Sequence, residues 1–217
     1  MKLAATLFDL DGTLLDTLDD LCDSMNRVLA AQGFSGHPRD AYRYFVGDGA
    51  AKLAARALPE DRRSESAIRA CLAAFSRDYG ENWNIKTKPY EGVPAMLTGL
   101  AERGLKLAVL SNKPDTFTRR CVTELLPDWR FDAVVGQRDD IAQKPDPAGA
   151  MEICARLDVP PSDVMYVGDS GVDMRTAVAA GMYPVGALWG FRRGDELREN
   201  GAKVLLQRPE DVLRLLA

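Results

Sequence analysis

The sequence is poor in the residues that define several common classes of functional site. Its single histidine, His37, precedes Pro38 in an expected loop, so we expect no catalytic role for it. The chain contains no Cys-x-x-Cys pair, which argues against a zinc site or a disulfide framework. Its four cysteines lie far apart among apolar neighbours, at Cys22, Cys71, Cys121 and Cys154. We therefore expect buried free thiols in a reducing compartment.

The sequence also lacks a long apolar run and a block of basic residues. No stretch is apolar enough to span a bilayer, and Asp9 and Asp11 interrupt the apolar start of the chain, unlike the core of a signal peptide. The formal net charge is −4, so we expect neither a nucleic-acid nor a membrane partner, and a cytoplasmic location. The charges of segment 192–199 are interleaved in sign, which is typical of a solvated face.

The pattern of apolar residues changes along the 217 residues. Between 17 and 86 they recur at helical spacing, as in Leu21, Met25 and Val28, and we expect only helices there. From Lys88 onward, short apolar runs alternate with helical segments, which is typical of right-handed β-α-β units around a parallel sheet. The sequence therefore predicts an α/β fold, a doubly wound, Rossmann-like core (1–16 and 87–217) with an inserted all-helical cap domain (17–86).

An apolar run that begins at Leu3 predicts the first strand of this core. Later strands are predicted at 105–110, 131–135, 163–167, 183–188 and 203–206. Helices are predicted at 93–103, 114–125, 147–157, 171–180 and 209–216.

Polar residues follow four of the predicted strands. They are Asp9 and Asp11, Ser111 and Asn112, Lys144, and Asp169 and Asp173. Each has an ordinary structural explanation, since Ser111 would cap a helix, Lys144 would sit in an exposed loop and Asp169 would sit in a turn. The carboxyl ends of parallel strands share one edge of a sheet, so we expect these side chains to converge there.

Together these residues suit phosphoryl transfer. A carboxylate nucleophile splits the reaction into two steps, and Mg²⁺ held by Asp9 and Asp169 would bridge the nucleophile and the anionic substrate. Lys144 and Ser111 would balance charge on the phosphoryl oxygens. Asp11 is placed to protonate the leaving oxygen and later to activate water.

The motifs Asp-x-Asp-Gly-Thr, Ser-Asn, Lys-Pro and Gly-Asp-Ser-x-x-Asp resemble those of the haloacid-dehalogenase-like superfamily over the whole chain. The resemblance implies that Asp9 is the nucleophile and a Mg²⁺ ligand, and that Asp11 is the general acid/base with its main-chain carbonyl on the metal. It implies metal binding by Asp169 and orientation of Lys144, or of a metal-bound water, by Asp173. It further implies phosphoryl-binding roles for Thr13, Ser111, Asn112 and Lys144. The presence of Asp11 resembles the phosphatase branch, since the dehalogenase branch lacks this second acid.

Three further stretches resemble the phosphoglycolate phosphatases, namely 45–58, 87–93 and 187–191. 2-Phosphoglycolate carries a carboxylate as well as a phosphate, so a cation on the cap would help to bind it. Lys52 and Arg56, one helical turn apart, and Arg43 are candidates, although a solvated helix face explains them equally well.

We therefore expect a Mg²⁺-dependent phosphatase of a small phosphate monoester, with 2-phosphoglycolate as the first choice of substrate and an aspartyl phosphate on Asp9 as the intermediate. We expect it to act as a monomer or homodimer. Alternatives within the superfamily are a pyrophosphatase, a sugar-phosphate phosphatase and a phosphoglucomutase. A signalling module that stores a phosphoryl group is a more distant alternative, and Asp11 and the large cap argue against it.

Overall fold

The computed structural model describes residues 3–216, which form two compact units. One unit, here called the core, comprises Met1–Leu15 with Pro89–Ala217; the other, here called the cap, comprises Asp16–Lys88. Two short strands, β2 (Leu15–Asp16) and β3 (Lys88–Pro89), pair where the chain passes between the units.

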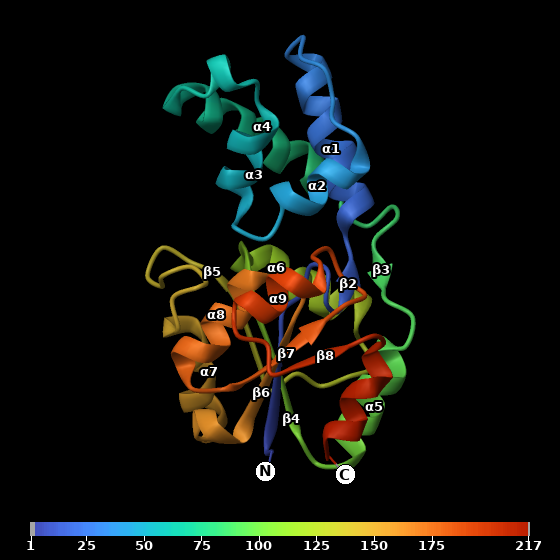
Figure 1. Cartoon of the computed structure of the whole chain (residues 1–217). Coiled ribbons are helices and arrows are strands. Elements are labelled where there is room, and N and C mark those ends of the chain that lie inside the picture. Colours follow the sequence, from blue (N-terminus) through green and yellow to red (C-terminus); the bar gives the residue numbers. More distant parts are fainter. Residues whose placement is uncertain (1–2, 217) are drawn as a thin grey trace. The chain divides into compact units, whose positions relative to one another are not determined.

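The core is built on a six-stranded sheet in the order β5-β4-β1-β6-β7-β8, with its strands parallel (Figure 1). The strands are β1 (Ala5–Phe8), β4 (Lys106–Pro114), β5 (Ala133–Gln137), β6 (Val164–Gly168), β7 (Tyr183–Ala187) and β8 (Val204–Leu206). β1 lies between β4 and β6, and all four of its residues are buried. This burial on both faces explains its uninterrupted apolar sequence.

Helices cover both faces of this sheet, which confirms the predicted doubly wound fold. They are α5 (Val93–Glu102), α6 (Asp115–Leu125), α7 (Ala148–Leu157), α8 (Gly171–Ala180) and α9 (Gly194–Glu199), with short 3₁₀ turns η2 (Pro161–Asp163) and η3 (Pro209–Leu216). α7 and α8 pack together on one side, and α5 packs with η3 on the other (Figure 1). The side chains of Leu7, Val135 and Tyr166 join Ile153 and Ala177 in one hydrophobic cluster under α7 and α8.

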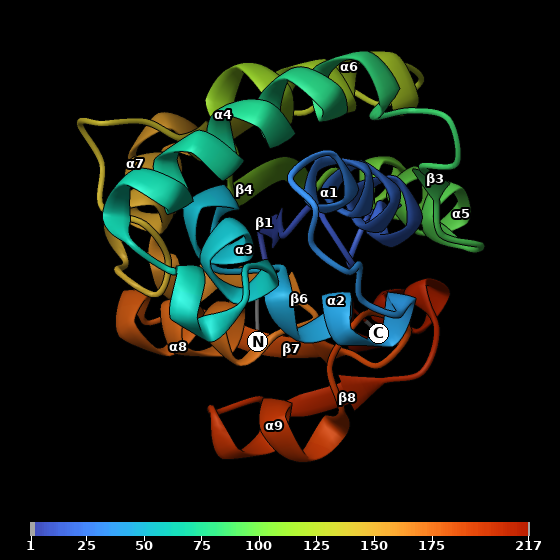
Figure 2. The ribbon, with the colours of Figure 1, turned by 90° about the horizontal axis from the view of Figure 1, so that it is seen from above.

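The cap consists of helices α1 (Leu18–Ala31), α2 (Arg39–Phe45), α3 (Ala50–Ala57) and α4 (Glu65–Asn82) and the turn η1 (Glu60–Arg62), which Figure 2 shows from above. The apolar face of α1, including Leu21, Met25 and Val28, is buried as its spacing predicts. Asp20 on α1 is also buried and accepts hydrogen bonds from the main-chain N–H groups of Lys86 and Thr87. This carboxylate therefore joins the first and last parts of the cap.

Some local predictions were wrong. The segment 192–199 is not simply a solvated face, because it contains α9 and the side chain of Arg192 is only 8% exposed. Its partner Glu196 also accepts a hydrogen bond from the N–H of Gly171, at the start of α8. The final helix, η3, is a 3₁₀ helix, and β4 continues past Leu110 to Pro114. The four cysteines are free and buried, as predicted.

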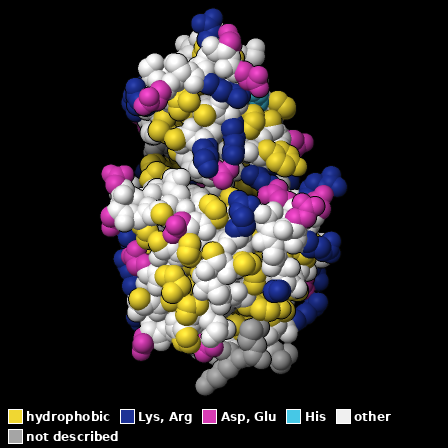
Figure 3. All heavy atoms as spheres, turned by 60° about the vertical axis from the view of Figure 1, so that its left-hand side comes forward, with side chains coloured by type: hydrophobic (Ala, Val, Ile, Leu, Met, Phe, Trp, Pro, Cys, Tyr) yellow, Lys and Arg dark blue, Asp and Glu magenta, His cyan; other side chains and the backbone are white. Residues whose placement is uncertain are grey.

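The face of the molecule in Figure 3 shows Lys and Arg side chains interspersed with Asp and Glu. Among the described helices, none is long and apolar enough to cross a membrane.

Candidate active site

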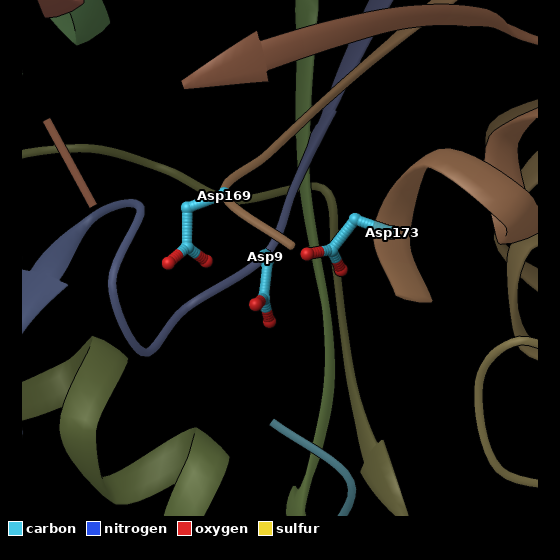
Figure 4. A group of neighbouring side chains, drawn as sticks. All are labelled: Asp9, Asp169 and Asp173. Atoms are coloured by element: carbon cyan, nitrogen blue, oxygen red, sulfur yellow. The ribbon is translucent and has the colours of Figure 1, made fainter. Parts of the chain in front are cut away.

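Three carboxylates meet at the carboxyl edge of the core sheet. Asp9 follows β1, Asp169 follows β6, and Asp173 lies in the first turn of α8 (Figure 4). Phe8 pairs with Val167 in parallel register, so the residues after β1 and β6 emerge side by side. Each side chain is buried, and one oxygen from each lies within 4.8 Å of the others. We call these three residues the carboxylate cluster.

Lys144 brings a positive charge into this cluster from the loop after β5. Its Nζ lies 2.9 Å from Oδ1 of Asp9 and 2.7 Å from Oδ1 of Asp173, and its side chain is 3% exposed. The side chain of Asn112 binds both main-chain polar groups of this lysine, its N–H and its carbonyl. The Lys144 N–H donates to Asn112 Oδ1 at 2.9 Å, and Asn112 Nδ2 donates to the Lys144 carbonyl at 3.2 Å. Asn112 thus positions Lys144 through its main chain.

Asp173 is held by several donors besides Lys144. Its Oδ2 accepts hydrogen bonds from the N–H of Ser170 at 3.1 Å and from the Ser170 hydroxyl at 2.6 Å. The Asp173 N–H in turn donates to the Ser170 hydroxyl oxygen at 3.4 Å, and this reciprocal pair of main-chain contacts is a capping box at the start of α8. Its Oδ1 accepts a hydrogen bond from the Tyr166 hydroxyl at 3.2 Å. We did not predict this role for Tyr166, because a tyrosine inside an apolar strand gives no signal beyond packing.

The electrostatics of the carboxylate cluster favour a bound cation. Burial raises the pKa of Asp9 well above its ordinary value, and the charge of Asp173 adds to this effect. Burial and Asp173 also raise the pKa of Asp169 to about 7, although the Phe191 N–H opposes this shift. Burial disfavours the charge of Lys144, but Asp173 and Asp9 overcome it and raise the pKa of this lysine well above its ordinary value. Three buried carboxylates, two of which contact one ammonium group, suit a hard metal ion with oxygen ligands.

Asp11 lies outside the carboxylate cluster and pairs with Lys113. Nζ of Lys113 lies 3.0 Å from Oδ1 of Asp11, and both side chains are largely buried. Sequence analysis missed Lys113, although its position directly after Ser111 and Asn112 was a usable signal. Gly12 turns the chain after Asp11 with a φ of +88°, which suits glycine.

Thr13 and Ser111 also lie at this edge of the sheet. The Thr13 hydroxyl is 3.4 Å from Oδ1 of Asp169, and the Ser111 hydroxyl accepts the N–H of Lys113 at 3.2 Å. The Thr13 carbonyl accepts a hydrogen bond from Nε1 of Trp189, at 2.9 Å. The motif residues of the core are therefore gathered at one edge.

The three predicted cap cations have partners within the cap. Lys52 and Arg56 both face Asp48, at 3.9 Å and 2.6 Å, and Arg43 lies 3.5 Å from Asp40. Arg56 also donates to the carbonyls of Tyr44 and Phe45. These contacts give Arg56 a structural role, and a substrate role for the three cations stays a prediction.

The model of the haloacid dehalogenase-like hydrolase family matches residues 6–187. The chain belongs to this family. The match covers β1 to β7 of this haloacid dehalogenase-like hydrolase, including the whole cap and the carboxylate cluster.

Individual relatives of this hydrolase agree on the subfamily. Phosphoglycolate phosphatase of Nitrosospira multiformis is 33% identical over 221 residues, covering 100% of this chain and 96% of the relative. Phosphoglycolate phosphatase of Rhodospirillum rubrum is 37% identical, covering 87% of this chain and 81% of the relative. The crystal structure of a predicted phosphoglycolate phosphatase from Haemophilus somnus matches with a TM-score of 0.92 and 26% identity, covering 100% and 99% of the two chains. These similarities confirm the predicted fold and the phosphoglycolate phosphatase-like class.

Proposed function

We propose that this hydrolase is a Mg²⁺-dependent phosphatase that cleaves 2-phosphoglycolate through an aspartyl phosphate on Asp9. The observation that carries the proposal is the carboxylate cluster with Lys144 bound to Asp9 and Asp173, which combines a nucleophile with a fixed positive charge. The names of the relatives support the choice of substrate.

In the first step, a carboxylate oxygen of Asp9 attacks phosphorus and the bond from phosphorus to the ester oxygen breaks. Asp11 donates its proton to that oxygen, so glycolate leaves as the alcohol. In the second step, Asp11 takes a proton from water as the water attacks phosphorus. The bond to Asp9 then breaks, which releases phosphate and restores the carboxylate.

The other residues of the core bind and orient. Lys144 neutralises charge on the phosphoryl oxygens, while Asp173 keeps its ammonium group in place. The hydroxyls of Thr13 and Ser111 and the amide of Asn112 add phosphoryl contacts. Mg²⁺, held by Asp9, Asp169 and the carbonyl of Asp11, would neutralise charge between the two anionic reactants.

The test is phosphate release from 2-phosphoglycolate, sugar phosphates and pyrophosphate, each with Mg²⁺ and with a chelator. We expect Mg²⁺-dependent release with the highest kcat/KM on 2-phosphoglycolate. A preference for pyrophosphate or sugar phosphates would contradict the substrate but keep the chemistry. Isomerisation of a hexose phosphate would indicate a phosphoglucomutase. A long-lived phosphoprotein without turnover would indicate a signalling module.

We also propose a cytoplasmic location, which the four buried free thiols support, and a monomer or homodimer without nucleic-acid or membrane partners.

A further inference from the structure

Lys113 is a buried cation that neither the motifs nor the proposed reaction uses. It lies near the end of β4, and its side chain is 6% exposed. Its ammonium group lies 3.0 Å from Oδ1 of Asp11, the proposed proton donor to the leaving group. A lysine is rarely buried in this way unless its charge has a specific use.

The leaving group of 2-phosphoglycolate has a feature that fits this pair. Its carboxylate is attached to the carbon that bears the ester oxygen, so the two groups lie about one hydrogen-bond length apart. Asp11 must reach the ester oxygen to protonate it. A donor that lies 3.0 Å from Asp11 is therefore at the right spacing for the neighbouring carboxylate. An ammonium group donates in three directions, so one lysine can serve two carboxylates.

The core thus provides a candidate carboxylate-binding residue independently of the cap. In the cap, Arg56 is bound by Asp48 and two main-chain carbonyls, and Lys52 also faces Asp48. These contacts already occupy Arg56, whereas Lys113 shares the edge of the sheet that carries Asp9 and Asp11.

We propose that Lys113 binds the carboxylate of the substrate and so selects 2-phosphoglycolate from other small phosphate esters. This inference rests on the proposed function, since it requires that 2-phosphoglycolate is the substrate. The ammonium–carboxylate contact is a charge-assisted hydrogen bond, and it forms on the leaving-group side of the phosphorus atom. An ester without the carboxylate cannot form it.

The experiment compares 2-phosphoglycolate with ethyl phosphate, which has a methyl group in place of the carboxylate. We measure kcat/KM on both for the unsubstituted protein and for Lys113→Met, which keeps an unbranched side chain one atom shorter but removes the charge. We expect kcat/KM on 2-phosphoglycolate divided by kcat/KM on ethyl phosphate to fall by about tenfold or more in the variant. Using this ratio cancels any effect of the variant on Asp11, which serves both substrates equally.

Two further variants keep the test decisive. Lys113→Gln retains a polar end and should lose the same preference, so the result does not depend on the folding of one variant. Lys203→Met is the matched control, because Lys203 is exposed and precedes β8. β8 is the outermost strand on the side of the sheet away from β4, which carries Lys113. It should leave the ratio unchanged.

Equal losses on both substrates would overturn the inference, because Lys113 would then act only by positioning Asp11. An unchanged ratio with full activity would overturn it too. If the unsubstituted protein showed no preference for 2-phosphoglycolate over ethyl phosphate, the proposed function itself would fail, and this result needs no variant.

Discussion

Lys144 contacts both Asp9 and Asp173, so the position of each of these side chains depends on the other two. Asn112 fixes the main chain of Lys144, and Tyr166 and Ser170 fix Asp173. Such a network holds charges that would otherwise be costly to bury. Its members lie far apart in sequence and are brought together by the order of the strands.

Replacing the proposed nucleophile should abolish the reaction. We expect Asp9→Asn to lower kcat by about a thousandfold or more and to remove the acid-stable phosphoprotein, because an amide does not form the aspartyl phosphate. Phosphate release and mass spectrometry of acid-quenched protein measure the two effects. Asp139→Asn, at an exposed position of the core, is the control and should retain full activity. A variant at position 9 that kept near-normal turnover would rule out the assignment.

Tyr166 offers a milder test of the network. Tyr166→Phe removes the hydroxyl that donates to Asp173 but keeps the ring beside Lys144, whose Nζ lies 5.8 Å from the ring centre. We expect a loss of about 1 kcal/mol in the free energy of unfolding, measured in urea, and a several-fold lower kcat. Tyr183→Phe, in a partly exposed position of β7, is the matched control. If the two variants had the same free energy of unfolding and the same kcat, the hydroxyl of Tyr166 would contribute to neither stability nor activity.

At the scale of elements, the loop after β1 is fitted closely against the residues after β6 and β7. A Cβ atom built on Gly12 would lie 2.4 Å from Oδ2 of Asp169, and one on Gly190 would lie 2.3 Å from the Gly12 carbonyl. Phe191 donates its N–H to the same Oδ2 at 2.7 Å. Three loops thus meet without room for an added methyl group.

This fit distinguishes two glycines with similar backbone angles. Gly12 has a φ of +88° and Gly104 a φ of +75°, but an added Cβ on Gly104 meets nothing within 4 Å. Gly104→Ala should therefore cost only the backbone strain, about 1 kcal/mol. Gly12→Ala should cost clearly more and also lower activity, because it displaces Asp169. Thermal unfolding and phosphate release measure both, and equal losses of stability would contradict the close fit.

The sequence predicted the elements whose apolar pattern is regular, and α8 was predicted to the residue because its capping pair and closing glycine are local signals. It did not predict α9, because charged residues on a short helix hide the single buried Leu197. The contacts between side chains of the candidate site were harder to predict. The contact of Lys113 with Asp11 spans 102 residues, and that of Tyr166 with Asp173 depends on how α8 packs on β6.

At the scale of the whole molecule, the core holds the proposed chemistry, and the cap, Asp16–Lys88, is an insertion of 73 residues in its sequence. The buried acids make the stability of the metal-free protein dependent on pH. Because the pKa of Asp169 in the folded state is about 7, against an ordinary value of 3.8, the folded state binds its proton more tightly than the unfolded state. The contribution of this group to stability therefore falls as pH rises from about 4 through about 7.

The matching experiment compares the protein with Asp169→Asn across this pH range in EDTA. The variant cannot ionise at this position, so we expect its advantage in the free energy of unfolding to grow as pH rises and to level off above pH 7. Adding Mg²⁺ at pH 8 should raise the melting temperature of the unsubstituted protein more than that of the variant. Parallel pH curves would contradict the raised pKa of Asp169, and equal shifts with Mg²⁺ would argue against Asp169 as a metal ligand.

The hydrogen bond between Trp189 and Thr13 spans 176 residues of chain. During synthesis the ribosome produces Asp9 and Asp11 long before it produces Lys144, Asp169 and Phe191. In a nascent chain, β1 and the acidic loop that follows it therefore lack their contacts with the residues after β6 and β7 until those later segments have been made. A chain truncated between Asp173 and Trp189 would contain all the motif residues but lack the segment that closes them together.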